Sequence, residues 1–291
     1  MHVPVLTQRI LEFLNPQPSQ NFIDATAGAG GHLKAILEKT GPRGKVLAID
    51  WDSDALKRIQ SDLSADFKKR TVFANDNFEH LREIAKREKF KRVQGILFDI
   101  GLSSDQLENS QRGFSFKKDE ALDMRFNLQH GLDAKKILNF WSRQDIEKTL
   151  KEYGEEQFAP LIAKAIVQRR SEKAIIKTSD LVKIIEDATP KWYHRKKLHP
   201  ATKTFQALRI AVNHELEALQ EALPEARDIL EKGGRVAVIS FHSLEDRIVK
   251  NFFKQDQALR IITKKPIIPS FQEQKLNPRS RSAKLRVAEK I

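Results

Sequence analysis

Residue types that could do chemistry gather around a glycine-rich turn near the start of the chain. The run Asp24-Ala-Thr-Ala-Gly28-Ala-Gly30-Gly31-His32 follows a short apolar stretch, and Asp50 ends the next one, 20 residues beyond Gly30. Glycines let the backbone approach a ligand closely, and a carboxylate at this spacing can accept hydrogen bonds from both ribose hydroxyls. The pattern favours binding of an adenosine-containing cofactor.

The same turn departs from the dinucleotide-binding fingerprint. Leu33 stands where a third glycine would complete Gly-x-Gly-x-x-Gly, so the usual pyrophosphate cradle is not encoded. Taken without Asp50, the glycines are equally typical of a tight connection between a strand and a helix.

The apolar pattern supplies elements that could position these residues. It predicts strands at 21–24, 45–50, 70–74, 93–99 and 234–240, with helical patterns between the first of them. This alternation indicates an α/β fold, a doubly wound parallel sheet covered by helices.

The middle of the chain reads differently, because strand signals are few between about 105 and 203. Helices are predicted there at 134–141, 143–150, 158–170 and 179–188, and a further one runs from about 204 to 222. We expect a core of residues 1–105 and 204–291, with an inserted helical domain at 106–203 that recognises the substrate.

Composition excludes several classes of protein. The 291 residues contain no cysteine, so a disulfide framework, a thiolate zinc site, an iron–sulfur cluster and a cysteine nucleophile are all excluded. No apolar stretch reaches the ~18 residues of a membrane span. We expect a cytoplasmic protein without a membrane partner.

The net charge of +13 is concentrated in two segments. Residues 191–203 hold five Lys or Arg and no acid, and residues 260–291 hold nine against Glu273 and Glu289. Trp192 and Tyr193 in the first segment could stack on unpaired bases. The second runs through small and polar residues, as phosphate-contacting segments often do, at Arg279, Arg281, Lys284 and Arg286. Polyanion binding and two solvated basic loops are both compatible with the charge alone.

The glycine-rich run resembles the first motif of the bacterial small-subunit ribosomal RNA cytidine-N4 methyltransferases, the RsmH (formerly MraW) family. Further blocks match in order along the whole chain: His2-Val-Pro-Val5, Asp99-Ile-Gly-Leu-Ser-Ser104, Arg112-Gly-Phe-Ser-Phe116, Leu122-Asp-Met-Arg125, Tyr153-Gly-Glu-Glu156, His199-Pro-Ala-Thr-Lys-Thr-Phe-Gln206, Ser240-Phe-His-Ser-Leu-Glu-Asp-Arg247 and Asn277-Pro-Arg-Ser-Arg-Ser282. Departures are confined to Ala27, Ala29, Asp105 and Phe126. Together the blocks are highly specific.

The resemblance implies an S-adenosyl-L-methionine-dependent enzyme with the class I methyltransferase fold, Rossmann-like, and an inserted small helical domain. It implies N4-methylation of a cytidine in the decoding region of 16S ribosomal RNA, within the 30S subunit, and is compatible with a homodimer. By motif match the cofactor contacts are Gly30, Gly31 and His32 in the loop, Asp50 at the ribose, Phe78 near the adenine, and Asp99 and Gln106 near the methyl donor.

The chemistry of methyl transfer limits which atom of cytosine can be the target. Methylation at carbon 5 of cytosine normally proceeds through a cysteine adduct, which this chain cannot form. An exocyclic amine needs no covalent step, but its lone pair is delocalised into the ring, and an acceptor beside the NH₂ can free it and take the released proton. Asp99 is the best candidate for that catalytic role.

Other parts of the site stay open at this stage. Ser103 and Ser104 are candidate second acceptors, and a ring to hold the base could come from Phe114, Phe116, Trp192, Tyr193 or Phe241. His242 and His32 have no carboxylate and histidine cluster at ligand spacing, so no metal is expected. The Leu122-Asp-Met-Arg125 block is interpreted as forming a structural salt bridge. For Glu245, Asp246 and Arg247 the sequence does not distinguish a structural role from a catalytic one.

Two other functions are compatible with the sequence. The chain could be an amino-methyltransferase acting on another nucleic acid, DNA included, because charge and fold would look alike. It could instead be an RNA-binding assembly factor whose cofactor pocket is vestigial, in which case it would not bind S-adenosylmethionine.

Overall fold

The computed structural model describes residues 4–291, apart from the side chains of 104 and 105; His2, Val3 and the side chain of Ser104 therefore lie outside the described residues. The chain divides into two compact units. Met1–Gly101 and Leu216–Ile291 form one, here called the sheet unit, and Leu102–Glu215 form the other, the helical unit. These divisions differ from the sequence-based ones, which fall at 105/106 and 203/204.

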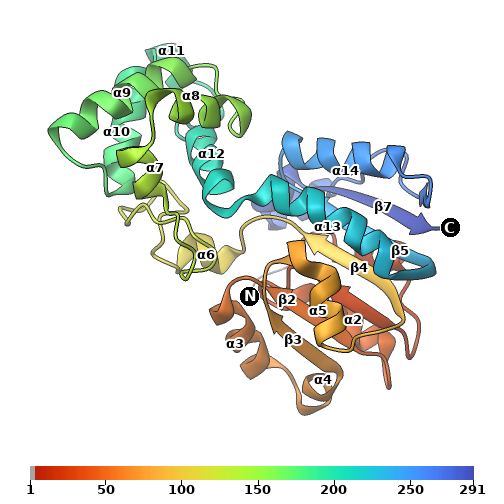
Figure 1. The fold of residues 1–291 in the computed structure, drawn as a ribbon. Helices are drawn as coiled ribbons and strands as arrows, with labels where there is room; N and C mark the ends of the chain where they lie inside the picture. Colours follow the sequence, from red (N-terminus) through yellow and green to blue (C-terminus); the bar gives the residue numbers. More distant parts are fainter. Residues whose placement is uncertain (1–3) are drawn as a thin grey trace. The chain divides into compact units, whose positions relative to one another are not determined.

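A seven-stranded mixed sheet organises the sheet unit, in the order β3-β2-β1-β4-β5-β7-β6 (Figure 1). Its strands are β1 (Asn21–Asp24), β2 (Val46–Asp50), β3 (Thr71–Asn75), β4 (Val93–Asp99), β5 (Leu230–Ser240), β6 (Leu259–Ile261) and β7 (Lys284–Lys290). The first five are parallel, and β7 is antiparallel to both β5 and β6. The strand order reverses between β1 and β4, which is where ligands bind in open α/β sheets.

Two layers of helices cover the two faces of this sheet. Buried side chains of α1 (Thr7–Leu14), α2 (Gly31–Thr40) and α3 (Ser53–Asp62) pack on one face, around Phe22 and Leu97. Those of α5 (Leu81–Arg87), α13 (Glu215–Ile229) and α14 (Ser243–Gln255) pack on the other, around Ile23, Ile96 and Phe98. Successive strand residues therefore enter opposite cores, which confirms the predicted doubly wound α/β fold.

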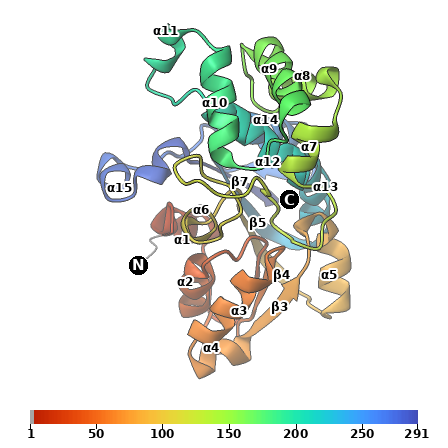
Figure 2. The same cartoon turned by 90° about the vertical axis from the view of Figure 1, so that its left-hand side faces the viewer.

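The helical unit has a hydrophobic core of its own. Its longer helices are α7 (Ala134–Phe140), α8 (Arg143–Glu152), α9 (Ala159–Glu172), α10 (Thr178–Ala188) and α12 (Thr202–Asn213), all visible in Figure 2. Shorter elements of the chain are α4 (Ala65–Arg70), η1 (Phe78–His80), α6 (Ser104–Glu108), α11 (Lys191–His194), α15 (Phe271–Leu276) and η2 (Pro278–Ser282). None of the helices described for residues 4–291 combines the length and apolarity needed to traverse a lipid bilayer.

The single helix predicted from about 204 to 222 is wrong. α12 ends at Asn213, where His214 adopts a left-handed conformation with φ of 50° and its N–H donates to Ile210. A second helix, α13, then continues to Ile229 with Pro224 inside it. The apolar period passes through this break without interruption, so only the backbone at His214 separates the two helices.

The interpretation of residues 260–291 as a phosphate-contacting segment is wrong for its last part. Lys284–Lys290 form β7, and Arg286 is buried there, with Nε 2.6 Å from Oδ1 of Asp246 on α14. Nζ of Lys284 lies 3.3 Å from the same carboxylate. Burial raises the pKa of Asp246, but the hydrogen bond and charge of Arg286 outweigh it and hold that pKa below its ordinary value. These two cations serve the fold.

We predict that Arg286→Ala destabilises the protein, because it leaves the carboxylate of Asp246 short of its main partner in a buried setting, at a cost of about 3 kcal/mol. Arg281 is the matched control, since it lies in the same segment, is exposed and makes no described ion pair. Arg281→Ala should change the unfolding free energy by less than about 0.5 kcal/mol. Urea unfolding followed by circular dichroism measures both, and equal midpoints for the two variants would contradict the structural role.

Candidate active site at the carboxyl edge of the sheet

Three aspartates end three neighbouring parallel strands. Asp24 closes β1, Asp50 closes β2 and Asp99 closes β4. The register pairs Asp24 with Ala48 of β2 and with Leu97 of β4, so the three strand ends lie at one edge of the sheet. Helix α2 begins directly beyond β1 at this edge, which gives the candidate site a set of acids beside a helix N-terminus.

The glycine turn is fixed at the points where only glycine fits. Gly30 precedes α2 with φ of +76°, a left-handed conformation that L side chains rarely adopt. A Cβ on Gly31 would lie 2.8 Å from Cγ of Pro4, so a side chain there would displace the N-terminal segment. Both predicted loop residues are therefore required by the local backbone.

Asp50 is held by the backbone of the turn. Its Oδ2 accepts from the N–H of Gly28 at 2.7 Å, and its Oδ1 accepts from the N–H of Asp52 at 2.8 Å. Burial raises the pKa of Asp50 to about 6, although these two hydrogen bonds favour the charged form. The carboxylate keeps further lone pairs, so it can accept hydrogen bonds from a diol as the sequence predicts.

Asp99, His32 and Asp24 form a buried polar cluster. Nε2 of His32 lies 3.4 Å from Oδ2 of Asp99, and the Asp99 side chain is 22% exposed. Oδ1 of Asp99, Oδ2 of Asp24 and both ring nitrogens of His32 are buried without a hydrogen-bond partner. Thr26 connects the strands, since its hydroxyl accepts from the backbone N–H of Asp99 at 2.6 Å.

Asp24 is a site residue that the sequence reasoning quoted but assigned no role. It is only 1% exposed, and burial raises its pKa to about 7, opposed by the charge of His32 and the N–H of Thr26 and assisted by Asp99 and Asp50. An acid closing a buried strand was the available signal. Strongly perturbed carboxyls of this kind gather at functional sites.

Phe78 and Gln106, the other two predicted cofactor contacts, lie in elements other than the strand ends and the glycine turn. Phe78 begins η1 and packs edge-on against Phe98, with ring centroids 5.6 Å apart. Gln106 belongs to the helical unit, where its Oε1 accepts from the N–H of Ser103 and Oγ of Ser103 accepts from the N–H of Gln106. Ser103 is thus engaged in a local cap, which is the common fate of a loop serine.

The five aromatic side chains that could hold the base differ in how far packing within the protein already occupies them. Tyr193 is buried and donates its hydroxyl to Oε2 of Glu156, and burial together with this hydrogen bond raises the pKa of Tyr193. Phe114 is buried and stacked on Phe126, with centroids 5.5 Å apart. Packing therefore occupies both of these side chains.

The other three candidate rings have more accessible surroundings. Phe116 stacks on His199 at 4.5 Å, and Trp192 is 54% exposed with Nζ of Lys196 over its ring. Phe241 belongs to the sheet unit and follows β5, two residues after Ile239, which pairs with Asp99.

Glu245 and Asp246, whose roles the sequence left open, both have structural partners. Glu245 is 1% exposed, and its Oε2 accepts from the backbone N–H of Phe241 at 2.8 Å. Asp246 pairs with Arg286, as described above. In the 122–125 block, Nη2 of Arg125 lies 2.7 Å from Oδ2 of Asp123, which confirms the predicted salt bridge.

The residues present fit an adenosine-containing methyl donor. Four buried polar atoms of the Asp24, His32 and Asp99 cluster lack partners, and buried polar groups in that state call for a ligand or a catalytic role. Gly30 and Gly31 place no side chain of their own at the start of α2, and Asp50 is oriented by backbone N–H groups. Among residues 4–291 no group of three or more His, Asp or Glu side chains could hold a metal ion.

Comparison with known proteins gives concordant matches. The sequence matches the MraW methylase family over residues 1–291. It is 46% identical to a ribosomal RNA small subunit methyltransferase H of Heliobacterium mobile, covering 100% of this chain and 99% of that protein. A protein of the same name from Clostridioides difficile is 40% identical, with 100% and 99% coverage.

Among solved structures, a candidate methyltransferase from Streptococcus mutans in complex with SAH covers 100% of both chains, with a TM-score of 0.50 and 14% identity. At that identity the likeness concerns the fold alone. It confirms the predicted class I methyltransferase architecture.

The raised pKa of Asp24 predicts a pH-dependent stability of the cofactor-free protein. Because the folded state holds this proton more tightly than the unfolded chain, stability is greatest below pH 4 for this group and falls as the pH rises to about 7. Asp24→Asn removes this loss, which is on the order of 4 kcal/mol at pH 8.

Urea midpoints at pH 5 and pH 8 test this prediction. The difference between the two midpoints should shrink in Asp24→Asn, and it should be unchanged in the control Asp62→Asn, whose side chain is exposed on α3. Parallel pH profiles for the wild type and Asp24→Asn would show that burial does not perturb Asp24.

Proposed function

The chain belongs to the MraW methylase family, and from this premise we propose that it transfers a methyl group from S-adenosyl-L-methionine to the N4 amine of a cytidine in the decoding region of 16S ribosomal RNA. The proposal is supported by relatives named ribosomal RNA small subunit methyltransferase H, which align over the full chain. The observation that carries it is the partly exposed carboxylate of Asp99, 3.4 Å from the buried ring of His32.

The cofactor half of the proposal concerns the sheet unit. S-adenosyl-L-methionine, when bound, supplies an electrophilic methyl group on a sulfonium. The residues proposed to hold it are Gly30, Gly31 and His32 at the start of α2, Asp50 at the ribose, Phe78 near the adenine, and Asp99 and Gln106 near the methyl donor. The free N–H groups of the α2 N-terminus favour a carboxylate there.

Asp99 has the properties of the required acceptor. The amine of cytosine becomes nucleophilic when a neighbouring carboxylate accepts one of its N–H bonds, and the same carboxylate can take the proton released on attack. Asp99 has one oxygen without a partner and lies at the topological switch point beside β1. Its backbone N–H donates to Oγ1 of Thr26, which fixes the main chain that carries the carboxylate.

His32 has a supporting role in this proposal. Its Nε2 lies 3.4 Å from Oδ2 of Asp99 without forming a hydrogen bond. A small rotation would convert this approach into a hydrogen bond, which would orient Asp99 and stabilise its charge. Asp24, which interacts electrostatically with His32 and Asp99, adds a titratable carboxyl with a pKa of about 7 that adjusts the charge around His32.

We propose Phe241 as the ring that holds the target base. It belongs to the same compact unit as Asp99, and a Cβ on Gly101, two residues beyond Asp99, would lie 3.4 Å from the Phe241 ring. The buried side chain of Glu245 fixes the Phe241 backbone. Stacking on an aromatic ring stabilises a base that has been rotated out of its own stack.

The helical unit is proposed to bind the RNA around the target. Its segment 191–203 carries five Lys or Arg and no acid, and Trp192 lies exposed there beside Lys196. A cation next to an exposed ring is a common arrangement for contacting phosphates and bases together. The proposed substrate form is the RNA within the small ribosomal subunit.

We predict that Asp99→Ala lowers the turnover number by about 100-fold or more, as expected for loss of a general base. Single-turnover methyl transfer to small-subunit RNA measures the effect, and calorimetry with S-adenosylmethionine measures cofactor binding separately. The exposed Asp62 provides the control, and Asp62→Ala should retain both. Wild-type turnover by Asp99→Ala would remove this residue from the mechanism.

We predict that cells lacking the gene lose N4-methylcytidine from their 16S ribosomal RNA, because the proposed reaction is the step that places the methyl group on that amine. Mass spectrometry of the rRNA nucleosides measures this, with restoration by the wild-type gene and not by Asp99→Ala. Unchanged N4-methylcytidine in the deletion strain would refute the proposed target. Absence of S-adenosylmethionine binding by the purified protein would indicate an assembly factor instead.

A further inference from the structure

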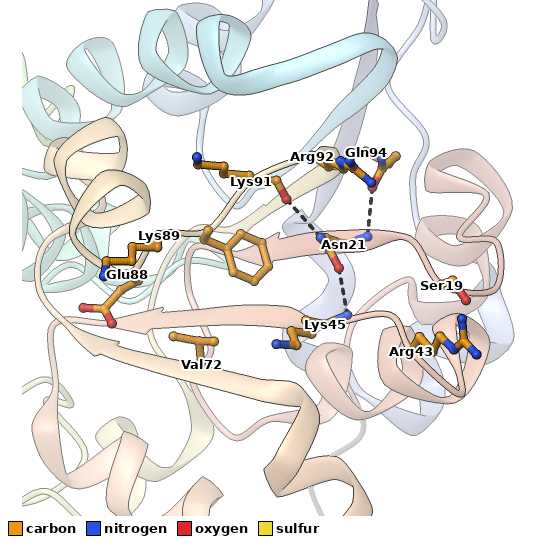
Figure 3. Close-up of a pocket in the computed structure, with 11 residues that line it drawn as sticks. Ser19, Asn21, Arg43, Lys45, Val72, Glu88, Lys89, Lys91, Arg92 and Gln94 are labelled. Carbon is orange, nitrogen blue, oxygen red and sulfur yellow. Dashed lines mark hydrogen bonds between the residues drawn. The ribbon is translucent and has the colours of Figure 1, made fainter.

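A cavity of about 490 Å³ lies at the opposite edge of the sheet from the three aspartates (Figure 3). Asn21 begins β1, Lys45 precedes β2 and Gln94 is the second residue of β4, so the cavity is formed at the amino ends of these strands. Asp99 lies five positions after Gln94 along β4, which is about 17 Å along an extended strand. This site is therefore distinct from the candidate active site.

The lining of the cavity is strongly cationic. Two loops contribute Lys and Arg residues, the 43–45 loop and the 89–92 loop, against the single carboxylate of Glu88. The cations are Arg43, Lys45, Lys89, Lys91 and Arg92, and all of them are exposed. Glu88 itself pairs with Arg87, 3.0 Å away.

These cations differ from those that stabilise the sheet. Arg286 and Arg235 are each paired with a carboxylate, Asp246 and Glu289. None of the five cavity cations pairs with a carboxylate in the described part of the chain. Concentrated like charge without partners is unfavourable for the isolated protein and attracts a polyanion.

The cavity floor is built to hold the two loops in place. The side chain of Asn21 accepts from the N–H of Lys45 at 3.0 Å and donates to the carbonyl of Lys91 at 2.9 Å (Figure 3). The backbone N–H of Asn21 in turn donates to Oε1 of Gln94 at 2.9 Å. One asparagine thereby sets the spacing between the two cationic loops.

The 89–92 loop is strained as well as charged. Lys89 and Arg92 have φ of 51° and 56°, in the left-handed region that residues with a Cβ seldom adopt. Buried Phe90 between them anchors the loop. Strained backbone persists where the surroundings determine it, and such positions cluster at ligand-binding sites.

We propose that this cavity is a second RNA-binding site, which holds phosphodiester groups of the substrate away from the target base; this inference rests on the proposed function. Phosphate contacts position a nucleic acid without reading its sequence. The separation from Asp99 means that the phosphates held here belong to nucleotides well removed from the target. The cavity therefore contributes to the affinity for RNA and leaves the chemical step unchanged.

The test variant is Lys45→Gln/Lys91→Gln, which neutralises one cation from each loop and leaves the backbone contacts of Asn21 intact. The matched control is Lys250→Gln/Lys254→Gln, which removes the same charge from exposed positions of α14. Neither pair includes a residue of the active site, and thermal melting checks that both variants fold.

Binding to a small-subunit rRNA transcript is measured over a range of salt concentrations. The test variant should bind roughly tenfold more weakly, and the slope of log K against log salt should fall by about 1.4, as expected for two lost phosphate contacts. The control variant should keep the wild-type affinity and salt slope. The test variant should keep the wild-type turnover number at saturating RNA.

Equal RNA affinity and salt slope for the two variants would overturn the inference. So would a loss confined to the binding of inorganic phosphate, which would identify a small-anion site. Failure of the proposed function is separable from both, because it would appear as wild-type protein that binds RNA through the cavity and methylates no cytidine.

Discussion

The placement of three carboxylates at the ends of parallel strands is the constraint on which this molecule depends. Strands that run side by side in one direction bring Asp24, Asp50 and Asp99 to a single edge, where burial opposes the charges of Asp24 and Asp50. The N–H of Gly28 donates to Asp50, the N–H of Thr26 donates to Asp24, and the ring of His32 lies beside Asp99. The fold thus keeps charged groups away from water at a cost in stability, and that cost is what makes the edge chemically competent.

Much of the fold could be predicted from the sequence because its strands are buried on both faces. Continuous apolar runs such as Val46–Ile49 leave few alternative interpretations, and β1 and β4 have the predicted bounds. β7 was missed for the opposite reason. Arg286 and Glu289 look like surface residues in a linear pattern, and only their partners, Asp246 on α14 and Arg235 on β5, make them suitable for a strand interior.

The site was predicted in part, through the types and spacing of residues along the chain. Motif matching named the loop, Asp50 and Asp99, but the closeness of His32 to Asp99 depends on the first turn of α2 facing β4. The raised pKa of Asp24 depends on burial, which no spacing reveals. The cationic cavity could not be predicted from the sequence either. Its two loops are separated by more than 40 residues, and hydrogen bonds to the side chain of Asn21 join them.

The insertion of the helical unit between β4 and β5 has a consequence for how the chain folds. These strands are neighbours in the sheet, yet about 130 residues separate them. Closing a flexible loop of that length costs about 4 kcal/mol of entropy before any contact is made. A helical unit that condenses around its own core first shortens this loop and brings β5 towards β4. The domain that is proposed to grip the RNA would then act earlier as an intramolecular folding aid, which lowers the entropic barrier to completing the catalytic edge.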